Sequence, residues 1–104
     1  MGLPVATDEV FKALADGTRR AIIQALAERP MAVHEVASLF AISRPAVSRH
    51  LRVLDEAGLV KARRAGKENR YELRSEQLGE VMDWLSRFWS GRLQTLKSLA
   101  ERTT

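Results

Sequence analysis

The sequence predicts a mainly helical domain with one small β-hairpin. Apolar residues recur at helical spacing along most of the chain, and the pattern changes to strand-like alternation only between about residues 59 and 73. The length of 104 residues suits one hydrophobic core, so we expect a single domain over residues 1–104. With 45% hydrophobic and 29% charged residues, the chain is too apolar to be disordered.

The composition excludes several kinds of chemistry. The chain has no cysteine, which rules out disulfides, thiolate metal sites and Cys nucleophiles, and it has only two histidines. It also lacks a Gly-rich phosphate loop and a convergent pair of carboxylates. We therefore expect no enzyme activity, no cofactor and no metal. The N-terminus does not resemble a signal peptide and no apolar run nears the ~20 residues of a membrane span, so we expect a cytoplasmic protein.

Two helices are expected first. Val10, Phe11 and Leu14 have helical spacing, which predicts a short helix over about 8–15. Asp16 is a candidate N-cap for a second helix over about 17–28. Pro30 ends that helix, because the residue before a proline disfavours helical geometry.

The next two helices are separated by a very short turn. Apolar spacing predicts a helix over about 33–40, starting after the poor capping residue Ala32. Ser43 is a strong N-cap for a helix that continues to about residue 57, and Pro45 lies in the first turn, where proline is tolerated. Gly58 is suited to end it. Two helices joined in this way form a helix-turn-helix, which we place at about residues 33–57.

The second of these helices has two distinct faces. At about 100° per residue, Val47, Leu51 and Leu54 form a buried stripe, while Arg49 and Arg52 point the opposite way. In a helix-turn-helix, the first turn of this helix and its outward face contact DNA. The candidate DNA-binding residues on it are Ser43, Arg44, Pro45, Ser48, Arg49, His50 and Arg52. His50 flanks the apolar stripe, so packing or a supporting hydrogen bond is an alternative to DNA contact.

A basic hairpin follows directly. Strands are expected over about 59–64 and 69–73, with a turn between them. A hairpin after a helix-turn-helix is a wing, here about residues 60–74, which can lie along the DNA backbone or minor groove. The candidate wing contacts are Arg63, Arg64, Lys67 and Arg70. Surface solubility is the alternative explanation for these charges.

The placement of charge supports a nucleic-acid-binding function more strongly than its total. The net charge of +4 is modest. Residues 44–74 carry nine basic and four acidic side chains, a balance of +5, whereas the rest of the chain carries eight and nine, a balance of −1. The excess positive charge therefore lies on the second helix of the helix-turn-helix and on the wing.

The residues from Ser43 to Leu51 (SRPAVSRHL), continuing through Leu54, Ala57 and 58–60, closely resemble the DNA-reading helix of ArsR/SmtB-type repressors. The stretch from Phe11 to Arg20 (FKALADGTRR) matches as well, although Gly17 stands where the family more often has proline. The resemblance covers about residues 8–100. It implies a winged helix-turn-helix homodimer that binds an inverted-repeat operator in double-stranded DNA and represses transcription.

In that family the first and last helices form the dimer interface. The last helix, expected over about 76–101, carries more apolar surface than a monomer of this size easily covers, although packing on its own domain is an alternative. The candidate interface residues are Val10, Phe11, Val81, Trp84, Leu85, Phe88, Trp89, Leu93 and Leu96. No other protein partner or inducer can be named from the sequence.

The sequence departs from the metal-sensing members of the family. Their Cys-x-Cys positions, aligned back from Ser43, fall on Ala32 and His34, and we expect His34 to be a surface residue. Their ligand pattern in the last helix, anchored at Asp83, meets leucine at its three other positions, 85, 96 and 99. The chain is thus similar to the metal-independent, SdpR-like branch.

Two other functions are compatible with the same fold. A winged helix can bind a protein partner, but the outward face of the DNA-reading helix would then be acidic or apolar, and here it is basic. A winged helix can also bind RNA, but the aromatic residues lie mostly on apolar faces, which leaves no evident platform for stacking bases.

Overall fold

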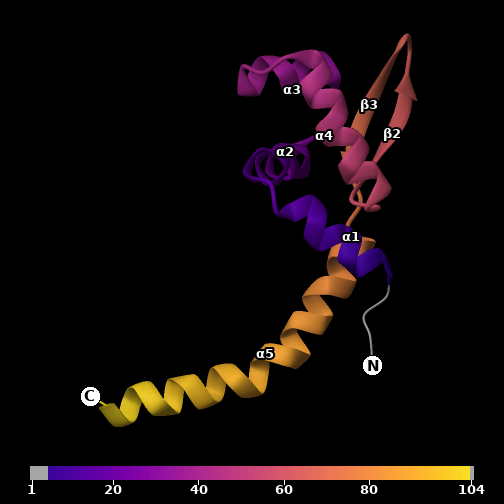
Figure 1. Cartoon of the computed structure of the whole chain (residues 1–104). Helices are drawn as coiled ribbons and strands as arrows, with labels where there is room; N and C mark the ends of the chain where they lie inside the picture. Colours follow the sequence, from indigo (N-terminus) through magenta and orange to yellow (C-terminus); the bar gives the residue numbers. More distant parts are fainter. Residues whose placement is uncertain (1–4, 104) are drawn as a thin grey trace.

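The computed structural model describes the backbone of residues 5–103 and the side chains of residues 8–87, 91–92 and 94–102. The order of elements is α1 (Val5–Leu14), α2 (Gly17–Glu28), β1 (Met31–Ala32), α3 (Val33–Phe40), α4 (Arg44–Glu56), β2 (Val60–Ala65), β3 (Glu68–Leu73) and α5 (Glu76–Thr103) (Figure 1). The mainly helical class with a small sheet is confirmed. The predicted bounds of α2 and α3 agree with the structure, whereas α1 begins earlier than predicted, at Val5.

The helix ends follow from local hydrogen bonds. The Asp16 carboxylate accepts the backbone N–H of Arg19 at 3.0 Å, and the Ser43 hydroxyl accepts that of Ala46 at 3.2 Å, so both predicted N-caps are confirmed. Gly58 ends α4 with a φ of 75°, a left-handed conformation that side chains disfavour.

The sheet has three strands, one more than the predicted hairpin. β2 and β3 pair antiparallel, and β1 adds to the free edge of β3 through Met31 opposite Tyr71 and Ala32 opposite Arg70, giving the order β1-β3-β2. Two residues are too few to show a period, so the sequence pattern could not reveal β1. Because α3 starts immediately after β1, this pairing attaches the helix-turn-helix to the wing.

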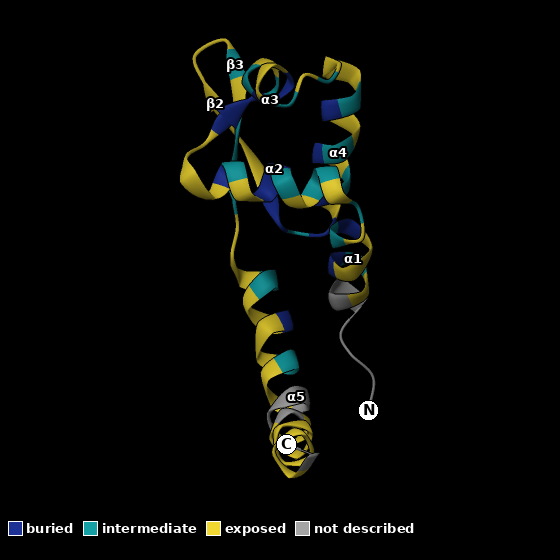
Figure 2. Cartoon of the chain, turned by 90° about the vertical axis from the view of Figure 1, so that its left-hand side faces the viewer, coloured by how far each residue is buried: buried dark blue, intermediate teal, exposed yellow. Residues whose placement is uncertain are grey.

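The core lies where α1, α2, α3, α4 and the base of β2 meet (Figure 2). Val47, Leu51 and Leu54 of α4 are fully buried in it, which confirms the predicted apolar stripe. Because three consecutive turns of α4 are packed in this way, the opposite side of the helix is held facing outward.

α5 is different from the other helices because most of it leaves the body. The start of α5 packs on α1, whereas the C-terminal half of α5 projects away and gives the molecule a longest dimension of 59 Å (Figure 1). Of the α5 side chains that the structure describes, only Val81 is buried. The alternative that α5 packs only on its own domain is therefore wrong. Over the described residues, no helix is long and apolar enough to cross a membrane.

Candidate nucleic-acid interface

The outward side of α4 carries the predicted cations. Ser48, Arg49 and Arg52 are exposed, as are Ser43, Arg44 and Pro45 at the N-terminus of the helix. Among the described residues, no carboxylate forms an ion pair with Arg44, Arg49 or Arg52. The helix N-terminus adds its own partial positive charge, which favours phosphate. The surface made by Arg44, Ser48, Arg49 and Arg52 is called the α4 basic face below.

This face borders the sheet. Arg44 and Ser48 line an open groove of about 460 Å³ whose far side includes Asn69 and Tyr71 of β3. The groove brings the start of α4 next to the wing strand, although these residues are far apart in sequence. Both elements can therefore touch one extended ligand.

The structure divides the four predicted wing cations into two groups. Arg63 pairs with Glu72 at 3.0 Å, and Arg70 pairs with Glu68 at 3.5 Å, so these carboxylates occupy their guanidinium groups. Arg64 only contacts the Gly66 carbonyl beside it, at 3.1 Å, and remains exposed.

Lys67, at the tip of the hairpin, is also exposed and has no ion pair with any described residue. Along β2, the side chains of residues 61 and 63 lie on one face of the sheet and that of residue 64 lies on the other. The acidic side chains of β3 reach only the first of these faces. The four predicted wing cations are therefore not equivalent. Within the described part of the chain, Arg64 and Lys67 are the two wing cations whose charge is free.

Arg70 has a second role that the sequence did not indicate. Its Nη1 lies 3.2 Å from Oε1 of Glu35 on α3, and the Glu35 Oε2 accepts a hydrogen bond from Arg29 at 2.9 Å. The backbone N–H of Ala32 donates to the same carboxylate at 3.0 Å and, with Arg29, lowers the pKa of Glu35 to about 2. Glu35 thus supplies the cap that Ala32 lacks and ties α2, α3 and β3 together.

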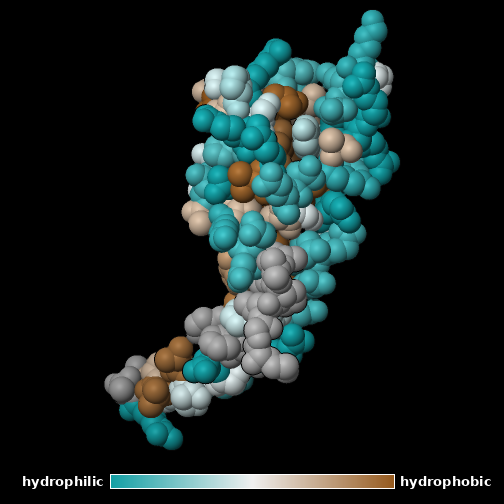
Figure 3. Space-filling view, turned by 45° about the vertical axis from the view of Figure 1, so that its right-hand side comes forward, coloured by the Kyte–Doolittle hydropathy of each residue, from teal (hydrophilic) through white to brown (hydrophobic). Residues whose placement is uncertain are grey.

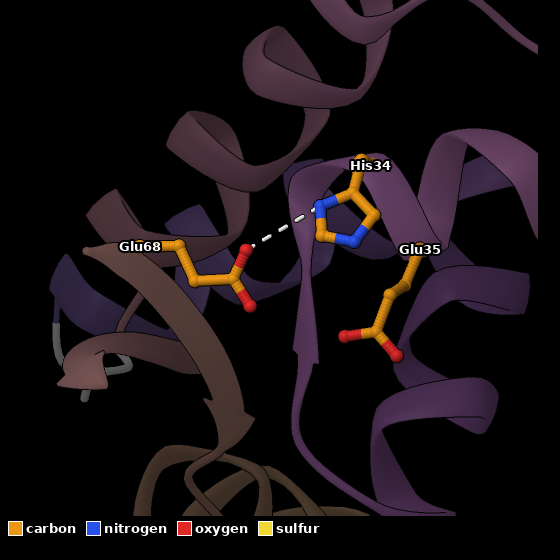
Figure 4. Close-up of side chains that lie close together, drawn as sticks. All are labelled: His34, Glu35 and Glu68. Carbon is orange, nitrogen blue, oxygen red and sulfur yellow. Dashed lines mark ion pairs between the residues drawn. The ribbon is translucent and has the colours of Figure 1, made fainter. Parts of the chain in front are cut away.

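His34 lies beside this network and is exposed, as predicted. Its Nδ1 is 3.5 Å from Oε2 of Glu68, and potential ligand atoms of His34, Glu35 and Glu68 lie within 4.8 Å of one another (Figure 4). Sequence spacing could not reveal this cluster, because Glu68 comes from β3. Arg29 and Arg70 already neutralise Glu35, so a divalent cation would have to displace both guanidinium groups. We therefore describe the cluster as part of an ion-pair network.

His50 points to the start of α2. Its Nδ1 lies 3.4 Å from Nη1 of Arg19 and 4.0 Å from Oδ2 of Asp16, and its side chain is only 22% exposed. Of the two alternatives left by the sequence, these contacts favour a supporting hydrogen bond over DNA contact.

The candidate dimer residues also fall into groups. Val10 and Val81 are buried in the chain's own core, at 0% and 3% exposure, so their side chains are not presented at the surface of the chain. Phe11 and Trp84 meet edge to face, with ring centroids 6.2 Å apart, where α1 packs on α5, and Leu85 is half-buried against the core. The side chains of Phe88, Trp89 and Leu93 lie outside the described residues.

An exposed apolar stripe follows α5. Met82, Leu96 and Leu99 are 50–58% exposed, and Phe11 of α1 is 39% exposed. Figure 3 shows hydrophobic atoms on the outside of the projecting part of α5. Leu99 belongs to the apolar face that the sequence predicts for the last helix, and Met82 adds to it. We call Phe11, Met82, Leu96 and Leu99 the apolar stripe.

A tightly turned pair of helices, a basic outer helix and a three-stranded wing define the class of winged helix-turn-helix transcriptional regulators. Within that class, the chain belongs to the ArsR family. The family model described as "Bacterial regulatory protein, arsR family" matches residues 16–62, which include the helix-turn-helix and the start of the wing.

Relatives along most of the chain agree with this assignment. The HTH-type transcriptional regulator Rv2034 of Mycobacterium tuberculosis is 49% identical over 83% of this chain and 80% of its own length. The transcriptional repressor SdpR of Bacillus subtilis is 35% identical over 78% of this chain and 90% of its own length.

Solved structures share the fold. An ArsR-like regulator from Rhodococcus sp. RHA1 superposes with a TM-score of 0.75 at 32% identity, covering 91% of this chain and 92% of its own. A possible ArsR-family regulator from Mycobacterium bovis, described as a homodimeric winged helix-turn-helix DNA-binding domain, has a TM-score of 0.67 at 29% identity, with 86% and 83% covered. The protein is therefore an ArsR-family transcriptional regulator.

Proposed function

We propose that this regulator is a homodimeric repressor that binds an inverted-repeat operator in double-stranded DNA. The observation that carries the proposal is the α4 basic face, where three arginines are exposed without acidic partners among the described residues, beside a wing that presents two more free cations. In this arrangement α4 enters the major groove and Arg64 and Lys67 contact the backbone beside it. The protein acts by binding, without catalysis or a cofactor, in the cytoplasm, where its DNA target would lie.

The apolar stripe supports the dimer. Large apolar side chains exposed on a projecting helix are costly to leave in water, and a second copy related by a two-fold axis would cover the same side chains on both chains. The Mycobacterium bovis neighbour described as homodimeric has the same fold over most of its length. Two α4 helices about one DNA turn apart would then meet an inverted repeat.

Two parts of the proposal have separate support. Repression is supported by similarity to a named repressor, and DNA binding without a metal is supported by the residues at the family's metal-ligand positions. SdpR is named a repressor, and it matches this chain over 90% of its own length. The thiolate positions of the family's metal sensors hold Ala32 and His34 here, and three of the four α5 positions hold leucine, which cannot ligate a metal.

Gel shifts and footprinting test the proposal. DNA selected from random-sequence duplexes by the protein should contain an inverted repeat, and the footprint should cover both halves. Competitor RNA at equal mass should not displace it, and addition of Zn²⁺ or a chelator should leave binding unchanged. Preferred binding of RNA, or no DNA binding at low salt, would refute the proposal and favour the RNA-binding or protein-binding alternative.

Light scattering tests the dimer. The wild-type chain of 11.7 kDa should have twice that mass in solution. Leu96→Asp should produce monomers, because it places a charge on the apolar stripe, whereas Ser98→Asp, two residues away on the same helix, is the matched control and should stay dimeric. Equal masses for both variants would show that the stripe is not the interface.

A further inference from the structure

One arginine connects the end of α1 to the middle of α4. Nε of Arg19 donates to the Ala13 carbonyl at 2.7 Å and Nη2 to the Lys12 carbonyl at 3.2 Å, so the guanidinium caps two carbonyls in the last turn of α1. Its remaining nitrogen, Nη1, lies 3.4 Å from Nδ1 of His50. A single planar group therefore contacts both the helix beside α5 and the helix that carries the α4 basic face.

Asp16 holds this junction in place. Its carboxylate accepts the backbone N–H of Arg19 at 3.0 Å, and this hydrogen bond holds the pKa of Asp16 below its usual value, so the group stays ionised. The same oxygen is 4.0 Å from Nδ1 of His50. The backbone of Arg19 is thus fixed by the α2 cap while its side chain reaches to α1 and α4.

The contact also gives the His50 ring a role. An arginine guanidinium has donors only, so in a hydrogen bond with Arg19 the acceptor is Nδ1 of His50. His50 is mostly buried while Arg49 on the preceding position is exposed. The ring is therefore placed to orient α4 and not to read a base.

We propose that Arg19 and His50 are positioning residues that transmit the geometry of the dimer to the two DNA-reading helices. This inference rests on the proposed dimeric function. α1 packs on α5 of its own chain and carries Phe11 of the apolar stripe, so a partner chain that covers the stripe would also contact α1 and fix its direction. Through Arg19 that direction sets the orientation of α4, and hence the separation of the two half-sites the dimer accepts.

Spin labels measure this coupling without DNA. Because the chain has no cysteine, Asp55→Cys at the exposed C-terminal end of α4 provides a unique attachment site on each protomer. Electron–electron resonance should give one narrow interprotomer distance in the otherwise wild-type dimer. His50→Phe, which keeps the ring shape but removes the acceptor, and Arg19→Lys, which removes the planar fork, should broaden that distribution.

Two further variants separate positioning from general damage. His50→Asn keeps an acceptor at the position of Nδ1 and should restore the narrow distance. Arg20→Lys is the matched control, because Arg20 donates to the Leu14 carbonyl of α1 at 2.7 Å but does not reach α4 in the described contacts. It should leave the distance unchanged.

The second readout is the half-site spacing. On the inverted repeat selected by the wild-type protein, His50→Phe should bind roughly tenfold more weakly, as expected when a hydrogen bond to a charged group is removed. It should also lose less affinity than wild type when one base pair is inserted at the centre of the repeat. If His50 instead contacted DNA directly, the insertion would cost both proteins equally.

The outcomes distinguish the two proposals. A labelled wild-type chain that gives no interprotomer distance refutes the dimer, and this inference with it. A wild-type distance that His50→Phe and Arg19→Lys leave unchanged refutes only the coupling. If Arg20→Lys broadens the interprotomer distance distribution as His50→Phe and Arg19→Lys do, the coupling is also refuted. Any lost hydrogen bond at the end of α1 would then have the same effect.

Discussion

The salt dependence of DNA binding should reveal which wing cations touch phosphate. The informative change is the double substitution Arg64→Ala/Lys67→Ala, which removes the two wing charges that have no acidic partner among the described residues. Arg63 and Arg70 are held by carboxylates on β3 and are left in place. Removing one cation that neutralises a phosphate reduces the steepness of log K against log salt concentration by about 0.9.

The magnitude follows from the free cations that α4 and the wing supply in each protomer. These are Arg44, Arg49, Arg52, Arg64 and Lys67. If all of them neutralise phosphates in a dimer, the wild-type slope is about −9, and the double variant, with two fewer such cations in each protomer, has a slope of about −5.4. Between 50 and 200 mM salt, the affinity of the wild type then falls roughly 10⁵-fold and that of the variant roughly 10³-fold.

Fluorescence anisotropy with a labelled operator, titrated at four or five salt concentrations, measures the slope. The control is Lys12→Ala/Arg74→Ala, which removes the same charge from residues that pair with Glu9 and Glu76 at 3.6 and 3.7 Å. It should keep the wild-type slope. An unchanged slope in Arg64→Ala/Lys67→Ala would mean that the wing does not touch DNA, and an equal fall in the control would mean that only net charge matters.

Four further outcomes are expected. Arg49→Ala and Arg52→Ala should each weaken operator binding by about 1–3 kcal/mol while the dimer mass stays unchanged, and a loss of folding by circular dichroism would show that the assigned face is wrong. Leu51→Ala should lower the free energy of unfolding in urea by about 2–5 kcal/mol, because the side chain is fully buried; a cost under about 1 kcal/mol would contradict that burial. Gly58→Ala should cost about 1 kcal/mol in the same assay, because its φ of 75° is strained for alanine, and a neutral result would refute the left-handed end of α4. The pKa of Glu35 falls from an ordinary 4.5 to about 2, so its contribution to stability is complete above about pH 4.5 and is lost as the pH falls through about 2. The wild type should therefore exceed Glu35→Gln in urea midpoint at pH 6, and the difference should shrink steadily as the pH is lowered from about 4.5 toward 2. A difference that stays constant over this range would exclude this carboxylate as the cause.

The third strand and the long-range contacts of two arginines could not be predicted from the sequence. β1 is only two residues long, and it exists because Met31 and Ala32 lie beside β3. The bond between Glu35 and Arg70 joins residues 35 positions apart, so no local spacing could predict it. Arg19 and His50 are 31 positions apart, so local spacing could not predict their contact either.

The sequence by itself determined the order of the helices, their capping residues Asp16 and Ser43, the buried stripe of α4 and the basic side opposite it. Each of these depends on interactions within about one helical turn, which the order of residues specifies directly. Only the tertiary structure decided which cations are free to meet a phosphate, where His50 points and which apolar residues of α1 and α5 remain exposed. Those properties depend on which distant residues become neighbours when the core closes, because a carboxylate or a packed side chain brought close in space changes what a residue can still bind.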